Sequence, residues 1–131
     1  MKNTIFKLTE HVYYFSLLVL VILYLFPGSL IGYFLYGNLG QQPNLITNPI
    51  GTSINHLIFF SYITSLAIIV RLRVKNIFTS FKIILFISGI LEILHLIVPN
   101  RAFELYDLLA NITGVTIVLL INSFIKWQKY F

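Results

Sequence analysis

FTSFKIILFISGILEILHLIVPNRAFELYDLLANITGVTIVLLINSFI, residues 78–125, is the stretch that decides the fold. Two apolar runs, 78–98 and 105–125, flank the short polar segment PNRAFE at 99–104. An apolar helix of about 20 residues crosses the hydrocarbon core of a bilayer, which is roughly 30 Å thick. The stretch therefore predicts two antiparallel membrane-spanning helices joined by a tight turn.

Two further apolar runs precede this hairpin, at about 12–36 and 54–70. Pro27-Gly28 interrupts the first run, so the helix either kinks there and continues, or the following residues form a short amphipathic element at the membrane surface. We expect an all-α, polytopic membrane protein with a single domain, 1–131, built as a four-helix bundle with that kinked or interfacial element. Lys2 and Lys7 before an apolar run also fit a secretory signal, but no small-x-small cleavage site follows them.

The composition of the 131 residues agrees with a membrane location. Hydrophobic residues make up 58% of the chain and charged residues 10%, whereas soluble domains carry about 25% charged residues. This composition excludes a water-soluble monomer, and the absence of cysteine excludes disulfides and thiolate metal sites. A net charge of +5 taken alone would suit a nucleic-acid-binding surface, but the apolar excess makes that a poor interpretation, and we expect no nucleic acid partner.

The basic residues predict the orientation, because Lys and Arg are concentrated in the cytoplasmic loops of membrane proteins. Eight of the nine basic residues lie before the first predicted span, around the connection between the second and third, or after the fourth. Arg101 alone falls on the opposite side. We therefore expect both termini and the 71–82 connection in the cytoplasm, and the loops at 37–53 and 99–107 outside.

Polar residues interrupt the outer end of the third predicted span. Glu92 and His95 share one helix face, with Gly89 one turn below them. Glu92 comes seven residues before Pro99, which places it about 10 Å inside the membrane. A carboxylate at that depth must face the interior of the bundle or a water-filled cavity.

The last predicted span carries a matching stripe. Asp107, Asn111 and Gly114 fall at i, i+4 and i+7, and the hairpin is expected to bring them against the Glu92 face. Asp107 also lies near the start of its helix, where it can pair with Arg101. The candidate catalytic residues are therefore Glu92 and Asp107, and the candidate ligand-binding residues are Arg101, Asn111, His95 and, at the outer start of the second span, His56.

The spacing Glu92-x-x-His95 also occurs in di-iron carboxylate bundles, but those sites need two such motifs and two further glutamates. This chain has one such motif. His56, Glu92, His95 and Asp107 are suitable ligand types for a single metal ion, yet the sequence does not fix their geometry. We therefore expect no metal and no cofactor.

The stretch from Glu92 to Gly114 resembles the signature hairpin of the VanZ-like family, small bacterial inner-membrane proteins whose pattern reads roughly E-x-x-Q, a short apolar step, P-x-R, then D-x-x-x-N-x-x-G. The matching residues are Glu92, Pro99, Arg101, Asp107, Asn111 and Gly114. The family has Gln where this chain has His95, and its second span opens D-K-x-x-H-F where this chain has Asn55-His56-Leu-Ile-Phe59-Phe60. The resemblance implies a role in the cell envelope, and the family is named for a protein linked to resistance to the glycopeptide teicoplanin.

The sequence leaves two functions open. A third, a transporter, is disfavoured because the cytoplasmic half of the hairpin lacks an ionisable pathway. The first is an outward-facing site that binds or modifies an envelope lipid or a lipid-linked cell-wall precursor. Arg101 would bind its phosphate or sugar head group while Asp107 or Glu92 handles protons, so an enzymatic activity stays open. The second is a non-catalytic module whose polar network locks the last two spans together. A bundle this small also leaves room for self-association or a membrane-protein partner.

Overall fold

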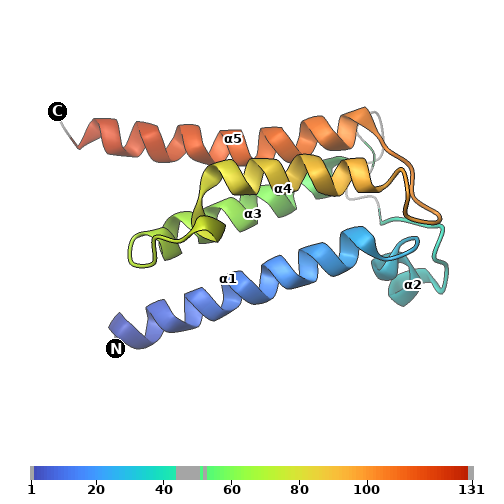
Figure 1. Ribbon diagram of the computed structural model, residues 1–131, viewed down its shortest axis with the longest axis horizontal. Coiled ribbons are helices and arrows are strands. Elements are labelled where there is room, and N and C mark those ends of the chain that lie inside the picture. Colours follow the sequence, from blue (N-terminus) through green and yellow to red (C-terminus); the bar gives the residue numbers. More distant parts are fainter. Residues whose placement is uncertain (1, 44–50, 52, 130–131) are drawn as a thin grey trace.

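The computed structural model describes residues 2–43, 51 and 53–129, and within them the chain is helical and forms no strand. Among these residues, four longer helices run along one another and two helices are short (Figure 1). The long helices are α1 (Lys2–Leu25), α3 (Ser53–Arg71), α4 (Phe81–Leu94) and α5 (Leu105–Gln128); the short ones are α2 (Leu30–Tyr36) and the 3-10 helix η1 (Ile77–Thr79). The all-α fold class is confirmed.

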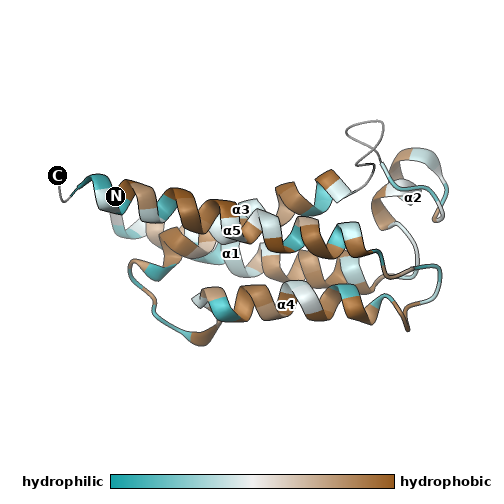
Figure 2. Ribbon diagram, turned by 90° about the horizontal axis from the view of Figure 1, so that it is seen from above, coloured by the Kyte–Doolittle hydropathy of each residue, from teal (hydrophilic) through white to brown (hydrophobic). Residues whose placement is uncertain are grey.

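Three of these helices are long and apolar enough to cross a membrane: Asn3–Leu25, Ser53–Arg71 and Leu105–Gln128. Hydrophobic residues predominate along the helices (Figure 2), and many large ones, such as Phe15, Phe86 and Leu120, are exposed. An apolar surface of this extent is costly in water and favourable against lipid. These helices indicate a membrane protein.

The third predicted span, 78–98, is shorter in the structure than the sequence indicates. Asn76 and Thr79 form a capping box around η1, so α4 begins only at Phe81. It ends at Leu94, and residues up to Val98 continue as hydrogen-bonded turns. With 14 residues α4 is about 21 Å long, so helix length alone does not support a fourth span.

The first predicted span, 12–36, is two separate helices rather than one kinked helix. α1 starts at Lys2, ten residues before the predicted start, and ends at Leu25. Gly28 has a φ of +85°, and a Cβ there would lie 2.7 Å from the carbonyl oxygen of Leu39. The Ser29 hydroxyl then caps α2 by accepting from the Gly32 N–H at 2.9 Å. Proline, a left-handed glycine and a capping serine in succession end one helix and start another.

The helices alternate in direction. Both ends of the chain and the α3–α4 connection lie at one end of the bundle, while α2 and the α4–α5 loop lie at the other, which we call the α2 end (Figure 1). α3 packs against α5 and α1, and α4 packs mainly against α5. The apolar core between them includes Tyr13, Leu20, Phe60, Ile63, Ala67, Ile84 and Val115. Residues 44–50 and 52 of the expected loop 37–53 lie outside the described residues.

α3 and α5 approach each other closely at Gly114. A Cβ on Gly114 would lie 2.5 Å from the backbone carbonyl oxygen of Leu57, and the Ser61 hydroxyl donates to the Gly114 carbonyl at 3.2 Å. Only a residue without a side chain permits this approach. Gly114 therefore sets how deeply the polar face of α5 sits against α3.

Gly114→Ala is expected to lower the free energy of unfolding by about 1–3 kcal/mol, because the backbone of α3 must move away from the new methyl group. The matched control is Gly89→Ala in α4, where a Cβ meets no atom within 4 Å and the gain in helix propensity is about 1 kcal/mol. Thermal unfolding of both variants in one detergent checks this. Equal shifts in Tm would contradict the importance of the close approach.

Candidate functional site

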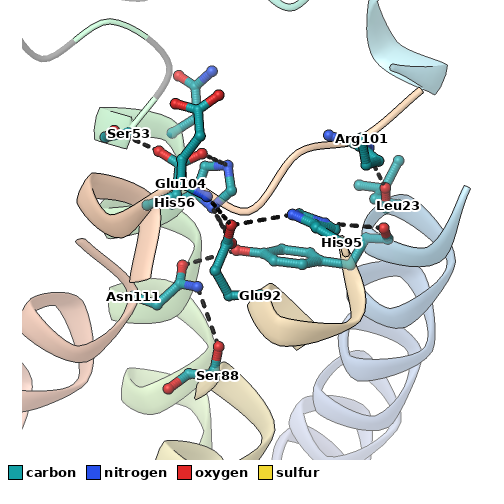
Figure 3. Close-up of polar contacts among 12 residues, drawn as sticks. Leu23, Ser53, His56, Ser88, Glu92, His95, Arg101, Glu104 and Asn111 are labelled. Atoms are coloured by element: carbon teal, nitrogen blue, oxygen red, sulfur yellow. Dashed lines mark hydrogen bonds and ion pairs between the residues drawn. The ribbon is translucent and has the colours of Figure 1, made fainter. Parts of the chain in front are cut away.

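A chain of hydrogen bonds near the α2 end joins all four long helices (Figure 3). The hydroxyl of Tyr24 on α1 lies 2.7 Å from His56 Nδ1 on α3 and donates to Asn111 Oδ1 on α5 at 2.8 Å. Asn111 Nδ2 donates to the carbonyl of Ser88 on α4 at 3.3 Å. All four residues are buried, and their polar groups satisfy one another within the bundle.

The chemistry of these groups fixes where the protons lie. A backbone carbonyl can only accept, so Asn111 must present its amide nitrogen to Ser88 and its oxygen to Tyr24. The single hydroxyl proton of Tyr24 is then used on Asn111. His56 Nδ1 must therefore carry a proton and donate it to Tyr24. This leaves His56 Nε2 as the nitrogen that faces the rest of the site.

Asp107 occupies the Nε2 side of His56. It lies in the first turn of α5, as expected from the sequence, and is buried. Its Oδ2 is 3.4 Å from His56 Nε2, and its Oδ1 accepts a hydrogen bond from the hydroxyl of Ser53 at the start of α3. Asp107 therefore joins α5 to α3.

Glu92 is fully buried, with 0% of the residue exposed, and lies in the last turn of α4. Its Oε1 accepts from the backbone N–H of Glu104 at 3.1 Å, and this bond holds the α4–α5 loop against α4. The same oxygen lies 3.2 Å from His95 Nδ1. The other nitrogen of His95 lies 3.2 Å from the carbonyl oxygen of Tyr24. The Tyr24 carbonyl requires a proton on this second nitrogen, Nε2, whereas the proton between His95 Nδ1 and Glu92 Oε1 fits either atom.

The sequence predicted that Arg101 would pair with a carboxylate, but in the structure it contacts the end of α1 instead. Its guanidinium donates to the carbonyls of Leu23 at 2.8 Å and Phe26 at 3.5 Å, at the end of α1. Within the described part of the chain it forms no ion pair with Asp107 or Glu92. The reason is the break after α1, which leaves carbonyls without helical partners that attract a cation.

Two charged groups of the α4–α5 loop titrate away from their ordinary ranges. Burial lowers the pKa of the Arg101 guanidinium, against the opposing effect of Tyr24 and of the two buried carboxylates. Partial burial, followed by the charges of Asp107 and Glu92, raises the pKa of the exposed Glu104 carboxyl.

A pocket of about 90 Å³ lies beside this cluster, between α1, α2 and α3. Apolar side chains make up most of its wall, including Leu20, Leu23, Leu30 and Phe59, and its polar lining includes His56, His95 and Arg101. Glu92 and Asp107 do not line it. The pocket thus combines an apolar wall with one cation and two imidazoles.

The structure brings His56, Glu92, Asp107 and Asn111 together, and puts His95 beside them. On α4, the residue expected to face Asn111 beside Glu92 was Gly89, but the structure has Ser88 there. Ser88 is buried against Asn111, while Gly89 faces open space. The sequence analysis did not single out Ser88, Ser53 or Tyr24. Helical spacing could have found the first two, which lie four residues before Glu92 and three before His56.

The fold and site together define a small helical membrane protein with a buried polar cluster and an adjoining pocket at one end. Comparison with protein-family models, curated proteins and solved structures finds no match for this chain. Its function is therefore argued from the geometry of the site.

Tyr24→Phe is expected to lower the free energy of unfolding by about 1–3 kcal/mol, because it leaves His56 Nδ1 and Asn111 Oδ1 buried without a partner. Tyr33→Phe is the matched control, since the side chain of Tyr33 on α2 is half exposed. Thermal unfolding in detergent measures both. A Tyr24→Phe variant as stable as the control would show that the hydroxyl does not hold the cluster together.

Proposed function

We propose that this chain is a VanZ-like protein of the bacterial inner membrane that binds an envelope lipid or a lipid-linked cell-wall precursor at the α2 end. The observation that carries the proposal is the pocket, whose lining combines apolar side chains with Arg101, His56 and His95. Such a lining suits an amphiphile with an anionic head group, because the tail contacts Leu and Phe side chains while the head group meets the cation.

Arg101 retains donors for such a ligand. A guanidinium has five N–H groups, and the bonds to Leu23 and Phe26 use Nη2 and Nε. The remaining donors can bind a phosphate oxygen, which is the ligand chemistry that arginine suits best. The contacts to α1 also hold the guanidinium in place, so little entropy is lost when the ligand binds.

The geometry supports binding better than chemical modification of the ligand. Glu92 and Asp107, the candidate acid and base, lie behind His56 and do not line the pocket. A general acid or base must reach the reacting group within hydrogen-bonding distance. Modification of the lipid, and an effect on glycopeptide susceptibility, rest on the family resemblance alone.

We further propose four membrane crossings, with both termini in the cytoplasm and the α2 end outside. Support comes from the alternating directions of α1, α3, α4 and α5, which place both chain ends together (Figure 1). α4 would complete its crossing with η1 and with the turns that follow Leu94. Arg71 and Arg73 lie at the end assigned to the cytoplasm, in line with the distribution of basic residues.

The orientation can be measured directly because the chain contains no cysteine. A cysteine introduced at Asn38, in the loop after α2, is expected to react with a membrane-impermeant maleimide added to intact spheroplasts. A cysteine at Lys75, in the α3–α4 connection, serves as the matched site and is expected to react only after the membrane is permeabilised. The reverse pattern would overturn the proposed orientation.

A second function, a non-catalytic structural module, is favoured by the hydrogen-bonded chain through Tyr24, which joins α1, α3, α4 and α5. Such a network contributes to uniqueness and stability without any ligand. A structural module would lose stability on Tyr24→Phe, yet its wild-type form would retain no more lipid than a variant with a blocked pocket. The lipid measurement below therefore separates the two functions.

Blocking the pocket is expected to remove the bound lipid. Ile31 lines the pocket and is half exposed, so Ile31→Trp can narrow the pocket without disturbing the core. Leu35→Trp on the same helix is the matched control, because Leu35 is exposed and lies outside the pocket lining. Native mass spectrometry after reconstitution with phosphatidylglycerol or a polyprenyl phosphate should show at least about tenfold less lipid on Ile31→Trp.

The charge of Arg101 is tested in the same way. Arg101→Gln is expected to retain less of either anionic lipid, while Arg73→Gln at the opposite end should retain as much as the wild type. Phosphatidylcholine serves as a control for the net charge of the head group. Equal retention by the wild type, Ile31→Trp and Arg101→Gln would contradict the lipid-binding proposal and leave the structural module.

A further inference from the structure

One oxygen of the buried cluster has no hydrogen-bond partner. Glu92 is fully buried, its Oε1 is used by Glu104 and His95, and its Oε2 has no partner among the described residues. The nitrogen Nδ1 of His56 lies 3.9 Å from Oε2, too far for a hydrogen bond. An unpaired carboxylate oxygen in an apolar interior costs several kcal/mol. Something is expected to fill that position.

No protonation state of the two histidines supplies the missing donor. The proton on His56 Nδ1 is directed to the Tyr24 hydroxyl at 2.7 Å. His95 approaches the opposite oxygen of Glu92 and cannot reach Oε2 at the same time. Arg101 is committed to the end of α1. The missing partner therefore comes from outside the described side chains.

Ligand atoms suited to a metal converge at the same place. His56, Glu92 and Asp107 each offer one atom, and these three atoms lie within 4.8 Å of one another. His56 Nε2 and Asp107 Oδ2 are 3.4 Å apart, close to the separation of about 3.3 Å between two ligands of a tetrahedral zinc ion. We propose that His56, Glu92 and Asp107 form a binding site for one divalent transition-metal ion, of which Zn²⁺ is the best match.

The groups around the three ligands are arranged as in established metal sites. A metal-binding histidine normally donates its second N–H to a fixed acceptor, and metal-binding carboxylates are themselves hydrogen-bonded. Here His56 Nδ1 donates to Tyr24, Asp107 Oδ1 accepts from Ser53, and Glu92 Oε1 accepts from Glu104. Each ligand residue therefore has one atom held by the protein, which leaves its second atom, His56 Nε2, Asp107 Oδ2 or Glu92 Oε2, for the ion.

The type of ligand atom selects the class of ion. One imidazole nitrogen and two carboxylate oxygens suit Zn²⁺ or Mn²⁺, whereas Mg²⁺ and Ca²⁺ prefer oxygen ligands alone. Two carboxylates also balance the charge of a divalent ion, which makes the site neutral when His56 is neutral. Three protein ligands leave at least one position of a zinc ion open.

The metal content of the full chain tests this inference without reference to lipid, so it can fail while the lipid proposal stands. The protein, purified without a polyhistidine tag and reconstituted in phosphatidylcholine nanodiscs, is stripped with a chelator and titrated with Zn²⁺, Mn²⁺ and Mg²⁺. We expect about one Zn²⁺ per chain by elemental mass spectrometry, weaker Mn²⁺ binding, and no Mg²⁺ retained after gel filtration.

Glu92→Gln, Asp107→Asn and His56→Gln are each expected to weaken Zn²⁺ binding by more than about 100-fold, since loss of a ligand exceeds the 10- to 100-fold effect of losing a supporting residue. The matched controls are Glu10→Gln and His11→Gln, at the opposite end of α1. They are expected to bind as the wild type does.

Circular dichroism and gel filtration identify any variant that fails to fold, and the nearly isosteric Glu92→Gln and Asp107→Asn keep the test decisive. Less than about 0.1 Zn²⁺ per wild-type chain, or equal binding by wild type and Glu92→Gln, would overturn the inference. In that outcome a buried water or a proton occupies the position beside Glu92 Oε2.

Discussion

The amide of Asn111 is the group on which the hydrogen bonding of the buried cluster at the α2 end depends. Inside a membrane, polar groups must find partners within the protein, and Asn111 reaches three other helices through Ser88, Tyr24 and, beyond Tyr24, His56. Because Asn111 contacts the backbone carbonyl of Ser88, which can only accept, the donors and acceptors from Asn111 through Tyr24 to His56 Nδ1 follow from the orientation of one amide. The same constraint leaves His56 Nε2 facing Asp107, so that an imidazole nitrogen and a carboxylate oxygen lie 3.4 Å apart in the cluster.

The carboxylates and Asn111 could be predicted because their relation is local. Asp107 and Asn111 lie one turn apart on α5, so their common face follows from helical spacing alone. What faces them depends on how the helices pack. The sequence suggested α4 across the hairpin, but Gly114 allows α3 to approach so closely that Ser53 and His56 become the partners of Asp107. Tyr24 could not be predicted because it comes from α1, distant in sequence from all its partners.

Arg101 shows how a helix end can compete with a carboxylate for a cation. Charge alone predicted that Arg101 would pair with Asp107. Pro27 and Gly28 end α1 nearby and leave the carbonyls of Leu23 and Phe26 to be satisfied, and the guanidinium binds those instead. The two buried carboxylates are consequently left to the histidines.

The pocket and the cluster are coupled through shared residues. Tyr24 and His56 line the pocket, and both belong to the hydrogen-bonded chain that orients the cluster. A ligand that moves either side chain must change the position of His56 Nε2 relative to Asp107, and a cation held between the carboxylates must in turn restrict the wall of the pocket. By linkage, each occupant changes the binding free energy of the other by the same amount. The buried side chains of Tyr24 and His56 thus satisfy the polar groups of the cluster and also form part of the wall of the pocket.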